Sequence, residues 1–172
     1  MKILVLNKTK AGLIGKASYK TIIKNRYKIS TLRLMKHNTV DSVSLIEIPK
    51  ISDEGGRGNL SVIEKEALPF DIARVYYLYD VPSDAYRGGH AHKNLQQFLL
   101  PLSGSFDVIL KDGKNTRSVT LNKPNKGLLI VPGIWRELEN FSSGAVCLVL
   151  ASAVYDEADY IRDYQYFKAY FS

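Results

Sequence analysis

Short apolar runs separated by polar turn residues dominate the chain beyond residue 40. The runs are rich in Val, Ile, Leu, Tyr and Phe, and they follow one another at close, fairly regular intervals. This spacing is typical of an antiparallel β-sandwich or barrel. The predicted strands are residues 43–48, 60–63, 72–79, 97–102, 105–110, 117–121, 127–131 and 147–151. The Asp112-Gly113 pair between two of these runs predicts a tight hairpin.

The last segment of the chain has a different period. Apolar and aromatic residues recur there at intervals of three and four, which places them on one face of a helix. They are Tyr160, Ile161, Tyr164, Phe167 and Phe171. Asp156 or Asp159 is expected to cap the first turn, because a carboxylate accepts hydrogen bonds from the free amides of a helix N-terminus. We therefore predict an all-β fold that ends in a C-terminal α-helix.

The composition allows one core domain. A chain of 172 residues with 45% hydrophobic content can bury a substantial core. Cys147 is the single cysteine, so no disulfide can form within the chain, and its apolar neighbours predict a buried, inert thiol. No stretch reaches the roughly 18 apolar residues of a membrane span, and the first residues lack the long apolar region of a signal peptide. We expect a cytoplasmic protein with no membrane partner.

Positive charge is concentrated at the N-terminus. Residues 1–40 contain ten Lys and Arg and no acid, whereas residues 41–172 carry 14 basic and 17 acidic residues, a net charge of 14 − 17 = −3. A basic arm can bind nucleic acid or an anionic membrane; alternatively, it is a solvated extension or adds strands to the barrel edge. The arm lacks the aromatic series and motifs of nucleic-acid binders, so we expect no nucleic-acid partner. The chain thus divides into a basic extension at 1–40 and a core domain at 41–172.

Two of the three histidines lie two positions apart, at His90 and His92. Alternate residues of a strand point to the same face of its sheet, so both imidazoles are expected to project together. Imidazoles that lie side by side serve either as metal ligands or as acid–base groups.

The surrounding residues help to choose between these roles. Metal-binding cupin barrels carry the motif Gly-x5-His-x-His-x3,4-Glu-x6-Gly, and here Gln97 takes the place of the glutamate and Asp84 that of the first glycine. A second cupin motif supplies another histidine, and here Arg136 takes its place, with three residues between it and Asn140. A guanidinium cannot ligate a metal and an amide binds divalent ions poorly. We therefore predict a cupin barrel that works without a metal or another cofactor.

Six segments between about residue 46 and residue 171 occur in an order and at intervals typical of one enzyme family. They are Gly-Gly-Arg57-Gly-Asn-Leu, Arg74-Val-Tyr76-Tyr77, Arg87-Gly-Gly-His90-Ala-His92-Lys93, Gly127-Leu-Leu-Ile-Val-Pro132, Val-Leu-Ala-Ser152 and Tyr155-Asp-Glu-Ala-Asp-Tyr160-Ile-Arg162-Asp-Tyr164. Together they resemble the cupin-type nucleotide-sugar 3,4-ketoisomerases, which act on dTDP-4-keto-6-deoxyglucose. That family often has Trp-His-Glu where this chain has Trp135-Arg136-Glu137. The resemblance implies a jelly-roll barrel and an isomerase that moves a keto group from C4 to C3 through an enediol, for deoxy amino sugar biosynthesis.

The reaction needs bases that accept and return protons near neutral pH, a task that suits imidazole. By resemblance, His92 is expected to carry the proton from C3 to C4, and His90 to handle the hydroxyl protons at O3 and O4. The residues alone leave this division open. The resemblance also implies a homodimer with exchanged strands, in which residues 43–48 or part of the basic arm would cross over.

Arg136 and Gln97 are candidates to stabilise the enediolate, because they supply positive charge and hydrogen bonds. Each residue also has a purely structural alternative role. Arg136 would then form an internal ion pair, and Gln97 would form hydrogen bonds with buried backbone groups. Neighbouring residues of a strand face opposite sides, so one of Tyr76 and Tyr77 is expected to line the cavity, and we choose Tyr76.

Arginines are the candidates to bind the pyrophosphate, because the planar guanidinium matches phosphate oxygens. Arg57 and Arg87 are flanked by glycines, which let a ligand approach the backbone closely. Lys93 is a weaker substrate-binding candidate, because it points away from the imidazoles if the strand continues past His92.

Three alternative functions share this fold. A metal-dependent cupin dioxygenase or epimerase is disfavoured by Gln97 and Arg136. A non-catalytic sugar-binding cupin would need no adjacent imidazoles. Related sugar 3,5-epimerases usually use a His–Asp pair with a tyrosine, and the sequence shows no obvious His–Asp pairing.

Overall fold

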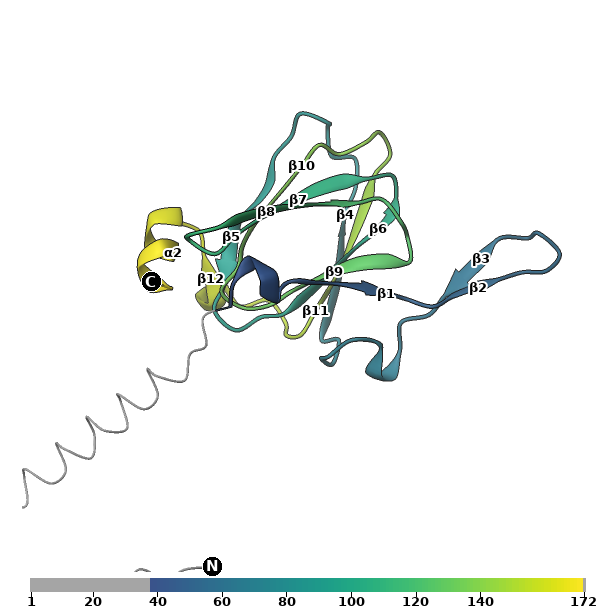
Figure 1. Ribbon diagram of the computed structural model, residues 1–172, viewed down its shortest axis with the longest axis horizontal. Coiled ribbons are helices and arrows are strands. Elements are labelled where there is room, and N and C mark those ends of the chain that lie inside the picture. The colour runs from purple at the N-terminus through teal and green to yellow at the C-terminus, as the bar shows by residue number, and fades with distance from the viewer. Residues whose placement is uncertain (1–37, 172) are drawn as a thin grey trace, which may run out of the picture. The chain divides into compact units, whose positions relative to one another are not determined.

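The structure, a computed structural model, describes residues 38–171. Two five-stranded antiparallel sheets face each other and enclose a barrel (Figure 1). The first sheet has the order β1 (Ser44–Glu47), β9 (Lys126–Ile130), β6 (Gln97–Ser103), β11 (Val146–Ala151) and β4 (Arg74–Leu78). The second has the order β12 (Tyr160–Ile161), β5 (Arg87–His92), β10 (Trp135–Glu139), β7 (Phe106–Lys111) and β8 (Thr116–Leu121). The predicted all-β jelly-roll fold with a C-terminal helix is confirmed.

Alternation along the strands builds the interior of the barrel. In β7, Phe106, Val108 and Leu110 are buried, while the residues between them are partly exposed. Their counterparts from both sheets form one apolar cluster, and each fully buried side chain of this size contributes roughly 1.5–3 kcal/mol to folding. Cys147 belongs to this cluster, and burial raises the pKa of its thiol to about 12, which confirms the predicted inert cysteine.

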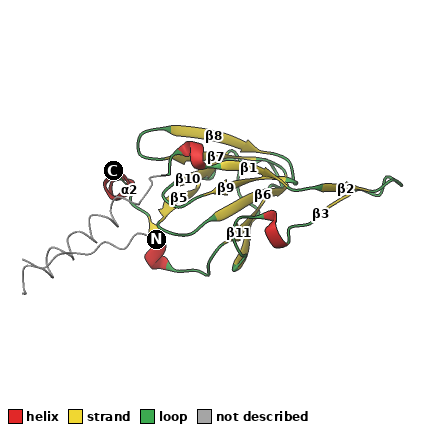
Figure 2. Ribbon diagram, turned by 60° about the horizontal axis from the view of Figure 1, so that its bottom comes forward, coloured by secondary structure: helices red, strands yellow, loops and turns green. Residues whose placement is uncertain are grey.

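A second apolar cluster lies on the opposite face of the first sheet. Phe98 and Leu100 of β6 alternate with the inward-facing Gln97 and Leu99, and they pack with residues from the chain that surrounds β2 and β3. The hairpin of β2 (Lys50–Ser52) and β3 (Asn59–Ser61) projects away from the barrel (Figures 1 and 2). All six of its strand residues are exposed.

The C-terminal segment differs from the predicted helix at its start. The α-helix α2 spans Tyr164–Tyr170, whereas Tyr160 and Ile161 form β12 and pair with β5. The predicted caps are wrong as well, because Asp163 caps α2 by accepting from the Tyr166 amide at 2.6 Å. Asp156 instead caps a 3₁₀-helix, η3 (Glu157–Asp159). The buried Phe167 of α2 packs near the Trp135 ring.

Most of the basic extension at 1–40 lies outside the described residues. Val40 begins a 3₁₀-helix, η1 (Val40–Ser42), and packs in the core, while β1 pairs with β9 of the same chain. The remaining 3₁₀-helix, η2, spans Lys65–Ala67. Among residues 38–171 no helix has the length and apolar character required to cross a membrane.

Candidate active site

His90 and His92 project together from the end of β5, as their spacing predicts. Their ring centroids lie 5.0 Å apart and their planes are nearly perpendicular, at 83°. Gly88 lets β5 approach β10 closely at this point: it has a φ of +83°, and a side chain there would meet the Arg136 carbonyl oxygen at 2.8 Å. A β-bulge interrupts the register of β10 next to this contact.

A cavity of about 120 Å³ inside the barrel borders His90. Five residues predicted from the sequence line it together, on β4, β5, β6 and β10: His90, Arg87, Gln97, Tyr76 and Arg136. Leucine and valine side chains make up most of the remaining wall. A small apolar cavity with a few convergent polar groups is the usual form of a site for a small molecule.

The guanidinium of Arg136 is the most deeply buried charge near the cavity, with a side chain that is 1% exposed. Its Nη1 donates to the carbonyl oxygen of His90 at 3.1 Å, whereas its Nε and Nη2 are buried and make no hydrogen bond with any described residue. Burial lowers the pKa of Arg136 to about 10, so the group remains a cation at neutral pH. Unpaired donors in a buried guanidinium are costly unless a ligand satisfies them.

Gln97 and Tyr76 form a hydrogen-bonded pair on the cavity wall. The Gln97 amide Nε2 donates to the Tyr76 hydroxyl oxygen at 2.8 Å. Burial raises the pKa of Tyr76, so the phenol keeps its own proton for donation to a ligand. Tyr77 is 60% exposed, and the predicted direction of the two tyrosines is therefore confirmed.

His92 is paired with a carboxylate, although no His–Asp pairing is obvious in the sequence. Its Nδ1 lies 3.0 Å from Oδ2 of Asp159, and the side chain of His92 is 0% exposed. The two residues are 67 positions apart, and the pairing of Tyr160 in β12 with His92 in β5 brings them together. Sequence reasoning missed Asp159 because no local pattern links it to β5.

Both imidazoles are neutral at physiological pH. Desolvation, followed by the positive charge of Arg136, lowers the pKa of His90 to about 3 and that of His92 to about 2. Neutral imidazole has a free lone pair, and here the buried His90 Nδ1 and His92 Nε2 make no hydrogen bond with any described residue. Each ring can therefore accept a proton from a bound molecule.

A second cavity, of about 190 Å³, borders His92 and is lined by Arg74, Ser152 and Tyr160, among others. The ring of Tyr160 lies 5.0 Å from His90 and 4.3 Å from His92, measured between centroids. The guanidinium of Arg74 lies over the Tyr76 ring, and its buried Nε makes no hydrogen bond among residues 38–171. Arg74 lies two residues before Tyr76 on one strand, so alternation along β4 is a signal that could have identified it.

Two predicted residues are not brought to the imidazoles within this chain. Arg57 lies between β2 and β3 on the projecting hairpin, is 84% exposed and forms an ion pair with Asp53 at 2.6 Å. Lys93 follows β5, and its Nζ donates to the carbonyl oxygen of Ala158 at 2.6 Å.

Metal ligands do not gather in the described part of the chain. Among residues 38–171, no group of three or more His, Cys, Asp or Glu side chains has a geometry that could hold a metal ion. Gln97, at the position of a cupin carboxylate ligand, instead bonds to Tyr76. The fold and the paired neutral imidazoles thus define a cupin-type enzyme site suited to proton transfer.

Comparison with known proteins identifies the family. The family model described as FdtA: WxcM-like, C-terminal, matches residues 41–172. A TDP-4-oxo-6-deoxy-alpha-D-glucose-3,4-oxoisomerase from Aneurinibacillus thermoaerophilus is 48% identical over 127 residues, which cover 73% of this chain and 90% of that protein. This chain belongs to the FdtA family.

Solved structures agree with this assignment. One is the 3,4-ketoisomerase QdtA from Thermoanaerobacterium thermosaccharolyticum, in which a histidine was replaced by asparagine and TDP-4-keto-6-deoxyglucose is bound. It is 44% identical, with a TM-score of 0.72 over 74% of this chain and 92% of its own. The TDP-quinovose 3,4-ketoisomerase WlaRB from Campylobacter jejuni is 46% identical, with a TM-score of 0.71 over 76% of this chain and 99% of its own.

Proposed function

We propose that this protein is a sugar 3,4-ketoisomerase that converts TDP-4-keto-6-deoxyglucose to the 3-keto isomer. The observation that carries the proposal is the pair of neutral imidazoles, with ring centroids 5.0 Å apart, in a chain whose relatives are 3,4-ketoisomerases. A ketone at C3 is an electrophilic carbon at which an amine can be introduced, which fits a role in making 3-amino sugars. The single, buried cysteine fits a reducing cytoplasm.

The reaction exchanges two protons and needs no redox cofactor. The C3–H bond breaks, and its electron pair forms the C3=C4 bond of an enediolate as the C4 ketone gains charge on oxygen. C4 then takes up a proton and the C3 hydroxyl loses one, which leaves a ketone at C3. One imidazole can carry the carbon proton from C3 to C4 while the other carries the hydroxyl proton from O3 to O4.

Exposure supports a division of these roles opposite to that expected from the resemblance. His90 is partly exposed and lines the inner cavity with Gln97 and Arg136, whereas His92 is 0% exposed and held by Asp159. We assign the carbon proton to His90, because it has access to a bound sugar. His92 then serves the hydroxyl protons.

Charge on the enediolate requires nearby donors. The unpaired Nε and Nη2 of Arg136 and the hydroxyl proton of Tyr76 fit that requirement, because these groups border the same cavity as His90. Gln97 holds the Tyr76 oxygen and so orients its proton.

Arginine side chains also fit the diphosphate. Arg87 is exposed at the start of β5 and borders the cavity that His90 lines, and Arg74 borders the cavity that His92 lines. A planar guanidinium matches phosphate oxygens, so both arginines are candidates to bind the diphosphate.

We further propose that the protein is a homodimer whose β2–β3 hairpin crosses to a second copy. We propose the β2–β3 hairpin as the exchanged segment in place of residues 43–48, because β1 pairs with β9 of its own chain. The hairpin carries exposed apolar residues, among them Ile51 at 58% and Leu60 at 57%. An isolated two-stranded hairpin with such residues is not stable in water on its own.

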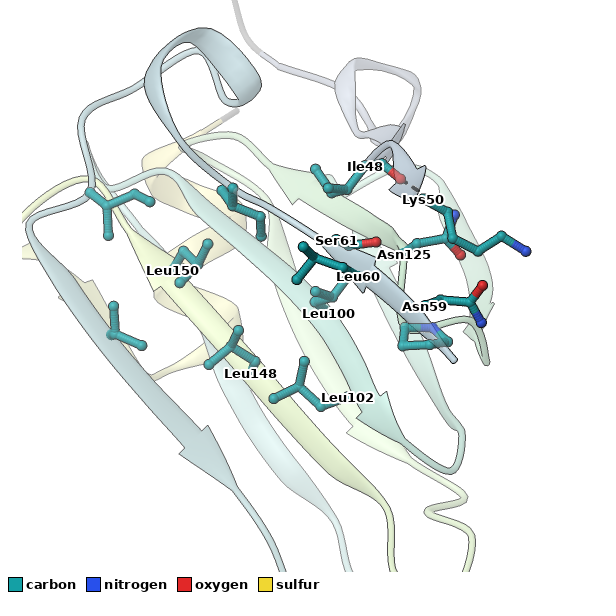
Figure 3. A pocket seen from close by; sticks show the side chains of 14 residues that line it. Ile48, Lys50, Asn59, Leu60, Ser61, Leu100, Leu102, Asn125, Leu148 and Leu150 are labelled. Atoms are coloured by element: carbon teal, nitrogen blue, oxygen red, sulfur yellow. Dashed lines mark hydrogen bonds between the residues drawn. The ribbon is translucent and has the colours of Figure 1, made fainter. Parts of the chain in front are cut away.

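An apolar groove of about 640 Å³ lies beside the hairpin on the outer face of the first sheet (Figure 3). Leu100, Leu102, Leu148 and Leu150 form its floor, and Leu60 borders it. A second copy that covers this face would bury Leu102, now 49% exposed, and could carry Arg57 toward the partner's site. Light scattering at micromolar concentration should give twice the chain mass, and Leu60→Asp should give a monomer; a monomeric wild type would overturn the dimer.

The His92–Asp159 pair, with Tyr160 against both histidines, also fits a nucleotide-sugar epimerase. The experiment that separates the two functions is incubation with TDP-4-keto-6-deoxyglucose in deuterated water, followed by NMR of the product. The ketoisomerase yields a 3-keto sugar with no deuterium at C5. Deuterium at C5 with the ketone still at C4 would establish the epimerase instead.

A further inference from the structure

The Asp159 carboxylate lies where the end of β5 meets the C-terminal segment. It is the last residue of η3, directly before β12. Its carbonyl oxygen accepts from the Lys93 amide at 3.0 Å, and the Lys93 ammonium holds the neighbouring Ala158 carbonyl. The backbone therefore fixes the position of Asp159 independently of its side chain.

Donors surround both carboxylate oxygens of Asp159. Oδ1 accepts from the backbone amide of Asn94 at 2.8 Å and from its side-chain amide at 3.1 Å. Oδ2 accepts from the Leu95 amide at 3.3 Å and lies 3.0 Å from His92 Nδ1. Backbone amides only donate, so these contacts require the carboxylate to act as an acceptor.

An accepting carboxylate determines the tautomer of His92. Nδ1 must carry the proton that it shares with Asp159, and the lone pair is therefore on Nε2. That atom is buried and makes no hydrogen bond with any residue in 38–171. A buried acceptor without a partner destabilises the folded state, so its retention fits a group that receives a proton from the substrate.

The surroundings otherwise oppose a charged His92. The side chain is 0% exposed, and the cation of Arg136 lies among the charges that act on it. A proton taken up at Nε2 would create an imidazolium in this environment. The Asp159 oxygen, at 3.0 Å, is an anionic group in direct contact with it.

We infer that Asp159 is a positioning residue for the isomerisation: it holds His92 as the Nδ1–H tautomer and stabilises the imidazolium that forms when Nε2 takes the O3 hydroxyl proton. The same proton is returned to O4, so that His92 ends each turnover neutral. This inference rests on the proposed function.

The first test is the tautomer of wild-type His92. In ¹⁵N-labelled full-length protein, long-range ¹H–¹⁵N NMR should show a protonated Nδ1 and an unprotonated Nε2, in signals that disappear in His92→Asn. A protonated Nε2, or the averaged signals of a free imidazole, would overturn the inference. No substrate is needed, so this result is separate from the proposed function, which would fail if the wild type did not isomerise the sugar.

The second test is Asp159→Asn, which keeps the size and one acceptor oxygen but can donate to Nδ1 and reverse the tautomer. We expect kcat to fall by about 10²-fold or more, with KM and TDP affinity within about threefold. Asp163→Asn is the matched control, because Asp163 caps α2. It should lower the melting temperature and leave kcat within about twofold.

A purely structural role for Asp159 predicts another pattern. The melting temperature of Asp159→Asn would fall while kcat and the His92 tautomer stayed as in wild type, and that result would overturn the inference. If Asp159→Asn does not fold, the NMR measurement of the His92 tautomer in the wild type tests the inference by itself.

Discussion

The Arg136 guanidinium donates to the backbone carbonyl of His90 at 3.1 Å, while its other two nitrogens, Nε and Nη2, are buried and form no hydrogen bond within residues 38–171. The cation is therefore held next to the imidazole pair with donors left for a ligand. Such an arrangement costs folding free energy and is retained where the charge has a use.

Replacing Arg136 with methionine should separate activity from stability. Methionine fills similar space without a buried charge, so the melting temperature should stay the same or rise. Turnover should fall by about 10²–10³-fold, as expected for the loss of a donor to an oxyanion. Thermal unfolding and steady-state kinetics measure the two effects, and a variant with normal turnover would remove Arg136 from the catalytic account.

The pH profile of kcat/KM should lack an acidic limb near pH 6.5. An ordinary imidazole is protonated below about pH 6.5, but burial and the Arg136 charge lower the pKa of His90 to about 3. Between pH 7 and 5 we expect kcat/KM to change less than about threefold, where an unshifted histidine would lose roughly 30-fold. A limb centred between pH 6 and 7 would contradict the role given to the neutral pair.

The same shifts make folding stability depend on pH in a definite direction. The unfolded histidines take up protons as the pH falls through about 6.5, whereas the folded ones, with pKa values of about 3 and 2, do not. The unfolded state is therefore favoured progressively below pH 6.5, by up to about 1.4 kcal/mol per pH unit for each histidine. Urea unfolding between pH 7 and 5 should show this loss, and the double variant His90→Asn/His92→Asn should show a flatter dependence.

Activity should survive metal chelators. Gln97 and Arg136 stand at two positions where metal-binding cupins have ligands, so we expect no stoichiometric transition metal and no loss of turnover with EDTA. Elemental analysis and an assay after chelation check this. One equivalent of bound metal, or activity restored by added metal, would contradict it.

Period-two alternation correctly predicted the inner wall of the site, because strand geometry alone fixes which side chains share a face. It placed His90 beside His92 and Tyr76 opposite Tyr77, and the structure confirms both directions. The strand β10, by contrast, was not among the predicted runs. Arg136, Glu137 and Glu139 make three of the five residues in Trp135–Glu139 charged, so the segment has no continuous apolar run.

Relationships that depend on tertiary pairing could not be predicted in the same way. Tyr160 and Ile161 fit a helical period, but pairing with β5 draws them into a strand and places Asp159 against His92. The glycines around Arg57 suggested a ligand, yet Gly56 and Gly58 have positive φ values in the turn of the hairpin. Turn geometry explains those glycines without a ligand.

The central claim is that the imidazole pair carries the protons of a C4-to-C3 ketone shift. It is tested most directly by comparing wild type, His90→Asn and His92→Asn on TDP-4-keto-6-deoxyglucose in deuterated water, with product and label followed by NMR. Asparagine keeps some hydrogen bonding but removes the base, which should lower the rate by roughly 10²–10⁴-fold. TDP affinity, measured in parallel, should hardly change.

The wild type should produce the 3-keto sugar, with deuterium at C4 unless the proton is fully shielded from solvent. His90→Asn should neither isomerise the sugar nor exchange the proton at C3. His92→Asn should isomerise slowly but retain some exchange at C3, because its proposed role is at oxygen. Near-normal isomerisation by both variants, with TDP affinity intact, would show that other residues move the protons and would contradict the account.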